Sequence, residues 1–193
     1  MREGGMGGRS WSTAFAAILG MAVLGGCIGS ISDEDFDRKV EERGGGLSED
    51  LVQEAVAALQ EEFHGQTVEF TSIGISPARI TMEVRVAGTA EDLDMYAYGS
   101  SGAHGGVGLS DPEPVPNQKS LEGELFRANQ VELDQLDEMV DEALAEADLA
   151  GGFAEGASIS RTGTVGVSVN VKNERRTVYA TFDANGTFLE VRE

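Results

Sequence analysis

Hydrophobic residues after position 46 follow helical spacing in two segments of the chain. From 48 to 63, apolar residues recur every three or four positions, which predicts an amphipathic helix. Ser48 is the expected N-cap of this helix, and Gly65 follows its end. The same spacing predicts a second helix from 133 to 149, which the glycines at 151 and 152 bring to an end.

Each predicted helix is followed by segments in which apolar and polar residues alternate, as they do in half-buried strands. From 93 to 98 the alternation places Asp94, Tyr96 and Tyr98 on the polar side. Asn185-Gly186 predicts a type I′ turn between the last two strands, because this pair tolerates positive φ angles. The predicted strands are 67–76, 78–87 and 93–98 after the first helix, and 157–161, 164–172, 177–183 and 187–191 after the second.

The order of one helix followed by a strand meander therefore occurs twice, in 47–116 and in 117–193. Corresponding elements lie roughly 80 to 86 positions apart, as an internal duplication would place them. Because each helix has one apolar side and each sheet one apolar face, the helix should cover that face. We therefore expect an α+β fold, a tandem repeat of one helix packed on an antiparallel meander sheet in a two-layer sandwich. Two units that share an interface and one continuous sheet both satisfy the pattern.

The first 26 residues have the pattern of a signal peptide. Arg2 and Arg9 precede an uncharged, mostly apolar stretch from Trp11 to Leu24. At about 14 residues, this stretch is shorter than the roughly 20 that a transmembrane helix needs. It ends in Leu24-Gly25-Gly26-Cys27, a motif that resembles the lipobox of bacterial lipoproteins.

The lipobox resemblance implies that a diacylglycerol is attached to Cys27 and that cleavage follows Gly26, so that acylated Cys27 begins the mature protein. Several acyl chains give stable membrane anchoring, whereas one chain alone is marginal. By the same resemblance, Ile28 implies sorting to the outer membrane if the host has two membranes. The alternative is an uncleaved membrane helix from Trp11 to Ile31. Residues 27–46 are rich in glycine, serine and charge, and we expect them to form an acidic tether.

The composition narrows the classes of partner and cofactor. The 193 residues include 34 acidic and 14 basic ones, which gives a formal net charge of −20. Such an acidic excess repels phosphate backbones, so nucleic acid is not an expected partner. One cysteine cannot form an internal disulfide, and His64 and His104 alone do not make a zinc site. We therefore expect no metal and no cofactor.

The sequence predicts no catalytic residue. The glycine-dense stretch 99–108 lacks the Gly-Lys-Ser or Gly-Lys-Thr of a phosphate loop, and we expect a flexible excursion from the sheet edge there. His104 lies beside Ser100 and Ser101, but no nucleophile elbow surrounds them. The carboxylates of the second helix occupy its outward positions, which is typical of a solvated surface, with a basic partner or weak cation binding as the alternative. We expect a protein that is not an enzyme.

The segment 179–186, Tyr-Ala-Thr-Phe-Asp-Ala-Asn-Gly, ends the second meander. With the tandem order of helix and meander, it is similar to the PepSY-like and β-lactamase-inhibitor-protein-like domains of secreted bacterial proteins. Segments 93–98, 111–115 and 121–126 also resemble bacterial lipoproteins of an uncharacterised family. These resemblances imply inhibition or binding of another protein, without assigning that role to particular residues.

Exposed tyrosine and arginine side chains suit protein interfaces, because they offer rigid, amphipathic contact area. The residues predicted to share the polar sheet face, and to form a binding surface, are Arg79, Arg85, Tyr96, Tyr98 and Tyr179. Ordinary cross-strand pairing on a wet face is the alternative.

The functional prediction is an extracytoplasmic lipoprotein, held at the cell membrane by the lipid on Cys27, that acts as a non-catalytic binding or envelope-associated module. An envelope protein is the expected partner. The alternatives are a proteinaceous inhibitor of a secreted hydrolase, a lipid or cell-wall carrier, and an enzyme. The sequence leaves the oligomeric state undefined.

Overall fold

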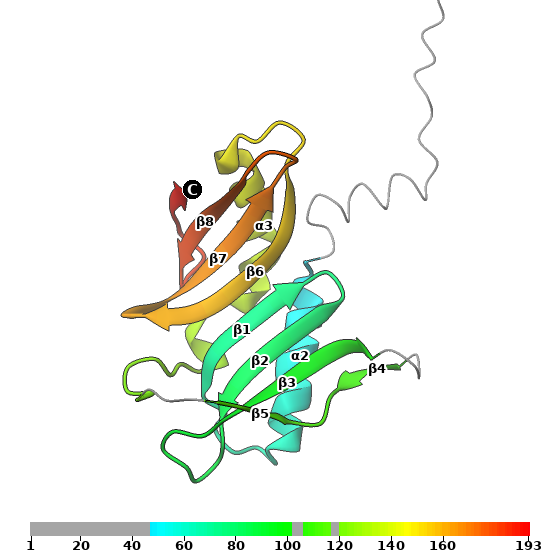
Figure 1. The fold of residues 1–193 in the computed structure, drawn as a ribbon, viewed down its shortest axis with the longest axis vertical. Coiled ribbons are helices and arrows are strands. Elements are labelled where there is room, and N and C mark those ends of the chain that lie inside the picture. The colour runs from blue at the N-terminus through cyan, green and yellow to red at the C-terminus, as the bar shows by residue number, and fades with distance from the viewer. Residues whose placement is uncertain (1–46, 102–105, 117–119) are drawn as a thin grey trace, which may run out of the picture. The chain divides into compact units, whose positions relative to one another are not determined.

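The computed structural model describes residues 47–101, 106–116 and 120–193. The predicted signal peptide, Cys27 and the acidic tether lie outside the described residues. Within them, the helices α2 (Glu49–Glu62) and α3 (Leu136–Ala147) lie on the same side of an antiparallel sheet (Figure 1). Two short 3₁₀ turns, η3 (Ala128–Gln130) and η4 (Leu133–Gln135), precede α3.

The sheet joins strands from both halves of the chain. Its order is β4-β3-β2-β1-β6-β7-β8-β9, and β5 pairs with β3 away from this path. In chain order the strands are β1 (Phe70–Ser76), β2 (Arg79–Arg85), β3 (Leu93–Ser101), β4 (Gly106–Leu109), β5 (Glu113–Val115), β6 (Phe153–Thr162), β7 (Thr164–Lys172), β8 (Thr177–Asp183) and β9 (Phe188–Arg192).

The first strand of each half lies at the centre of the sheet. β1 pairs antiparallel with β6, and this register sets Ile73 opposite Ile159 and Ser72 opposite Ser160. The choice that the sequence left open is therefore decided: within the described residues, the strands of the two halves form one continuous sheet.

The core lies between the sheet and the two helices. The central strands send alternate side chains to this layer, so that Ile73, Val169 and Ala180 are completely buried in one core with residues of the helices such as Val52 and Ala143. Burial of a large aliphatic side chain stabilises a fold by roughly 1.5 to 3 kcal/mol relative to leaving it exposed. A helix that covers one apolar sheet face is the α+β arrangement expected from the alternation.

Most elements lie where the spacing predicts them. α2 begins after the N-cap residue Ser48, and β7 and β8 have the predicted bounds. β4 and β5 were not predicted, since glycine and proline dominate their segments. β4 pairs with the end of β3, which extends to Ser101, and β5 pairs with the start of β3 at Leu93–Met95.

The predicted type I′ turn before β9 is wrong. Gly186 has a φ of 78°, but Asn185 is not among the described residues with positive φ. The loop is longer, because the Asp183 amide donates to the Thr187 carbonyl and the Gly186 amide donates to the Asp183 carbonyl. The Asp183 carboxylate also accepts bonds from the Asn185 and Thr187 amides, at 2.9 Å each. These bonds stabilise a three-residue loop with glycine in the left-handed position.

Candidate functional site

The open face of the sheet, opposite the helices, is made of small polar residues. Neither helix of the described residues covers it (Figure 1). Paired residues of an antiparallel ladder share a face, so the register alone defines its members. Across β2, β1, β6, β7 and β8 they include Thr81, Glu83, Ser72, Gly74, Ser158, Ser160, Ser168 and Thr181.

Three of the five predicted binding residues lie on this open face. Arg79 and Arg85 follow the same alternation as Thr81, and Arg85 forms an ion pair with Glu69. Tyr179 stands opposite Asn170 on β7 and Arg192 on β9, with 42% of its surface exposed. The structure therefore places arginines in the first half and a tyrosine in the second on one continuous surface.

The placement predicted for Tyr96 and Tyr98 is wrong. Their register partners on β2 are Met82 and Ile80, both completely buried, so the two tyrosines face α2. The Tyr96 ring packs edge-on against Phe63, with 6.0 Å between ring centroids. Burial, followed by the nearby carboxylates of Asp94 and Glu62, raises the pKa of Tyr96.

The Tyr98 side chain lies at the edge of the covered face, and its hydroxyl bonds to α2. The hydroxyl donates to Glu54 Oε2 of α2 at 3.2 Å. Desolvation and this carboxylate raise the pKa of Tyr98. Both tyrosines therefore serve as apolar bodies with a polar tip, which fits the edge of a core better than a wet surface.

A shallow hollow of about 190 Å³ lies over β6 to β9 on the open face. Ser160, Ser168 and Thr181 line it together with Glu190 and Arg192. The hydrogen bond from Arg192 lowers the pKa of Glu190, and that bond raises the pKa of Arg192 in turn. The hollow offers hydroxyl groups beside a fixed ion pair.

A second hollow, of about 430 Å³, lies where β1 and β6 separate. The ladder between these strands ends at Ser72 and Ser160, and beyond it Phe70 pairs instead with Phe126 of the connecting segment. The two Phe70–Phe126 backbone bonds measure 2.8 and 2.9 Å, and the two rings pack at 5.8 Å. The connecting segment around Phe126 thus lies beside Phe70, where β1 no longer pairs with β6, and a polar hollow lies next to it.

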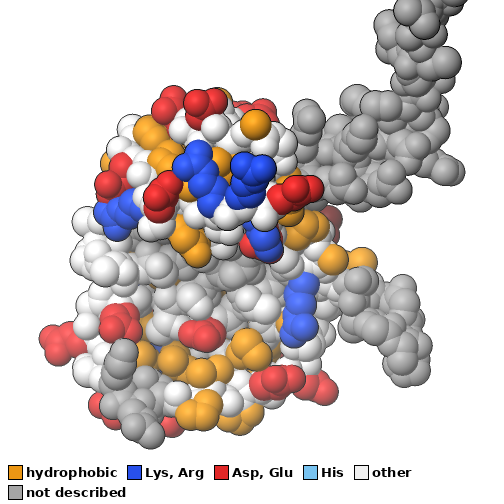
Figure 2. Space-filling model, turned by 45° about the horizontal axis from the view of Figure 1, so that its top comes forward, with side chains coloured by type: hydrophobic (Ala, Val, Ile, Leu, Met, Phe, Trp, Pro, Cys, Tyr) orange, Lys and Arg blue, Asp and Glu red, His pale blue; other side chains and the backbone are white. Residues whose placement is uncertain are grey.

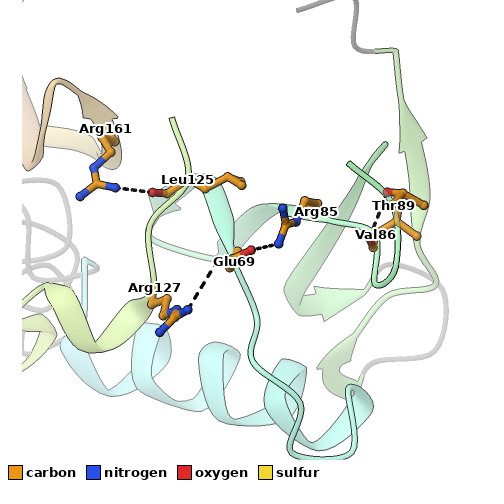
Figure 3. Close-up of polar contacts among 7 residues, drawn as sticks. All are labelled: Glu69, Arg85, Val86, Thr89, Leu125, Arg127 and Arg161. Carbon is orange, nitrogen blue, oxygen red and sulfur yellow. Dashed lines mark hydrogen bonds and ion pairs between the residues drawn. The ribbon is translucent and has the colours of Figure 1, made fainter. Parts of the chain in front are cut away.

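Arg127 and Arg161 line this second hollow, and Figure 3 shows their contacts with Glu69 and with the Leu125 carbonyl. Arg161 Nη1 donates to the Leu125 carbonyl at 2.7 Å, which joins the end of β6 to the connecting segment. Arg127 approaches Glu69 at 3.7 Å, and the same carboxylate pairs with Arg85. Arg161 Nε is buried and has no hydrogen-bond partner among the residues that the structure describes. Sequence analysis did not single out Arg127 or Arg161, since no local pattern links positions 36 residues apart such as 125 and 161.

Charged side chains elsewhere are mostly exposed. In Figure 2, basic and acidic side chains are interspersed over the upper part of the view, while white polar side chains and backbone fill its middle. Lys172, Arg176 and Arg192 each pair with a carboxylate. The predicted acidic positions of the second helix, from Glu132 to Asp148, are exposed.

The histidines and the serines beside them do not form a site among the described residues. His64 is exposed and has a φ of 52° just after α2. His104 lies outside the described residues, as do the side chains of Ser100 and Ser101. The described parts of the chain contain no cluster of three or more His, Cys, Asp or Glu residues able to hold a metal. In those parts, neither length nor apolar character allows any helix to cross a membrane.

Comparison with known proteins gives one structural similarity. No family model matches the sequence, and no curated protein matches it. The crystal structure of a candidate lipoprotein from Clostridium difficile 630 is similar to this chain, with a TM-score of 0.49 and 11% sequence identity. The alignment covers 73% of this chain and 91% of that one.

Proposed function

We propose that this chain is an extracytoplasmic lipoprotein, anchored through lipid on Cys27, whose α+β unit binds an envelope protein without catalysing a reaction. The observation that carries the binding role is the open sheet face, which is polar and uncovered by either described helix. The Leu24-Gly25-Gly26-Cys27 motif supports the anchor.

The binding face combines two properties that favour a protein partner. Its serines, threonines and glycines are short, so a partner can approach the backbone closely and find hydroxyl groups to bond. Tyr179, Arg79 and Arg192 extend above them from strands that are fixed by a shared core. A tyrosine has few rotatable bonds and loses little conformational freedom on binding, and an arginine adds several hydrogen-bond donors.

A tandem duplication is part of this proposal. Each half consists of a helix followed by a meander, and α2 and α3 both pack on the same face of the sheet. The first strands, β1 and β6, pair antiparallel. Two fused copies related by a two-fold axis through this pair would have that order, as would the PepSY-like and inhibitor-like domains that the sequence resembles.

The anchor is tested by Cys27→Ser in cells supplied with labelled palmitate. The unchanged protein should carry label and sediment with membranes, whereas the variant should lose the label. A Ser30→Ala variant beside the motif is the matched control and should keep it. Label that persists in Cys27→Ser would refute the anchor.

The binding face is tested by a steric block. Ser158→Arg places a long charged side chain at the centre of the open face, whereas Ala145→Arg places the same group on the exposed side of α3. A specific partner cross-linked in envelope extract should be lost with Ser158→Arg and kept with Ala145→Arg. A partner kept by both variants, or no specific partner, would contradict the proposal. A captured secreted hydrolase that becomes inhibited would identify the protein as an inhibitor.

A further inference from the structure

We propose that the hollow between Arg127 and Arg161 is a binding site for a small oxoanion, a carboxylate or phosphate group. This site is separate from the open-face partner proposed above, because other residues line it and it needs no second protein. Its ligand chemistry follows from charge, from the geometry of Arg161 and from the size of the hollow.

The hollow is locally positive in a strongly acidic chain. Arg127, Arg161 and Glu69 line the hollow, and Arg85 pairs with Glu69 from outside the lining, so these four residues together have a net charge of +2. The chain as a whole has a net charge of −20. Two of the 14 basic residues, Arg85 and Arg127, pair with Glu69, and a third, Arg161, lines the same hollow. Because Glu69 is shared by Arg85 and Arg127, it does not neutralise Arg161.

Arg161 is held in place before any ligand arrives. Its Nη1 bond to the Leu125 carbonyl fixes the plane of the guanidinium (Figure 3). A guanidinium has five N–H donors, and this carbonyl uses one of them. The buried Nε–H lacks a protein acceptor. A buried donor without an acceptor is costly, so an oxoanion or water that bonds to the fork relieves an existing deficit.

Arg127 supplies the second, adjustable donor. Its side chain is 56% exposed and its guanidinium lies 3.7 Å from Glu69, a loose contact that leaves donors available. Its backbone amide donates to Gln130 Oε1 at 2.9 Å, which fixes the adjacent turn η3. Two arginines that line one hollow match the several acceptor oxygens of a carboxylate or phosphate.

The size of the hollow favours a small molecule. At about 430 Å³ it lies in the range of small-ligand sites, roughly 300 to 1,000 Å³. Leu125 and Phe126 also belong to the lining beside the arginines, and Asn129 adds an amide. An oxoanion with a short carbon skeleton therefore fits this lining better than a cation or a purely apolar ligand.

The site is tested by titrating the full chain, purified in detergent, with inorganic phosphate and separately with citrate. Calorimetry measures affinity, and the arginine Nε–H signals in NMR spectra report contact with Arg161. We expect binding of at least one anion and a shift of the Arg161 signal. Arg161→Gln and Arg127→Gln should each weaken binding about tenfold or more, as expected for loss of a charged hydrogen bond.

Arg175→Gln is the matched control, because it removes the same charge from an exposed turn between β7 and β8. Binding by this variant should be unchanged. Arg127→Gln keeps the test valid if Arg161→Gln does not fold, since the Arg127 side chain is largely exposed. The proposal would be overturned if neither phosphate nor citrate binds, or if Arg175→Gln weakens anion binding as much as Arg161→Gln and Arg127→Gln do. The steric block at Ser158 should leave anion binding intact, so this test and the partner test fail independently.

Discussion

The two faces of the sheet are built from neighbouring residues but have opposite chemistry. Ile73 is completely buried against the helices, whereas the adjacent Ser72 faces the open side with Ser160. The covered face carries the apolar area that stabilises the fold, and the open face carries hydroxyl groups and charges. Because side chains alternate with a period of two, a one-residue slip in register would exchange these roles. The difference indicates that stability and binding can change independently in this molecule.

The largest expected effect comes from a matched pair of tyrosines on opposite faces. Tyr96→Ala removes a ring buried against Phe63 and should lower the free energy of unfolding by about 3 to 5 kcal/mol. Tyr179→Ala removes an exposed ring and should change it by less than about 0.5 kcal/mol. Urea denaturation measures both. An equal loss of unfolding free energy in the two variants would contradict the difference between the two faces.

Backbone geometry sets a limit on how freely the open face tolerates change. Gly99 has a φ of 147°, and a Cβ atom there would lie 2.3 Å from the Ala78 carbonyl oxygen. Gly99→Ala should therefore destabilise the fold by about 1 to 3 kcal/mol in denaturation experiments. Its partner across the ladder is Gly108, where a Cβ atom meets nothing within 4 Å. Gly108→Ala should be nearly neutral, and a cost equal to that of Gly99→Ala would show that the strain argument fails.

The smallest expected effects concern how stability changes with pH, and they have opposite signs for Glu49 on α2 and Asp183 on β8. Desolvation, with the carboxylates of Asp137 and Glu138, raises the pKa of Glu49 at the start of α2. Glu49 therefore contributes to stability below its unfolded pKa, and this contribution is lost as the pH rises through its folded pKa. The amides of Thr187 and Asn185 lower the pKa of Asp183 at the end of β8. Its contribution is present above its unfolded pKa and is lost as the pH falls through the folded value.

Carboxyl NMR titration between about pH 2 and 7 spans the ordinary pKa values of both groups. Glu49→Gln should raise stability at pH 7 and have little effect at the acidic end. Asp183→Ala should lower stability at pH 7 and have less effect after acidification. The same sign for both variants at pH 7 would contradict this assignment.

The sequence predicts the regular elements well because their spacing is local. β7 alternates valine with polar or small residues along its whole length, a bend at Gly163 precedes it, and a turn that begins at Asn173 follows it. β4 and β5 could not be predicted, because their residues pair only where β3 provides an edge. Tyr96 was misplaced because its hydroxyl suggested a wet face, although most of the side chain is apolar.

The two candidate sites differ in the same way. Tyr179 and Arg79 can be assigned to a polar face from alternation alone. The arginine hollow depends on Phe126 entering the sheet beside Phe70, 56 positions away. No periodicity encodes that meeting, so the contact between Arg161 and the Leu125 carbonyl is visible only in three dimensions.

The central pairing of β1 with β6 has a consequence for the time at which the molecule can assemble. Ser72 and Ser160 are neighbours there although 88 positions separate them, so this pairing can close only after most of the chain has been made. A chain threaded through a membrane from its amino end, as the proposed anchor requires, would present β1 long before β6 arrives. Under that proposal, the β1–β6 pairing can form only on the far side of the membrane, after both halves of the chain have passed.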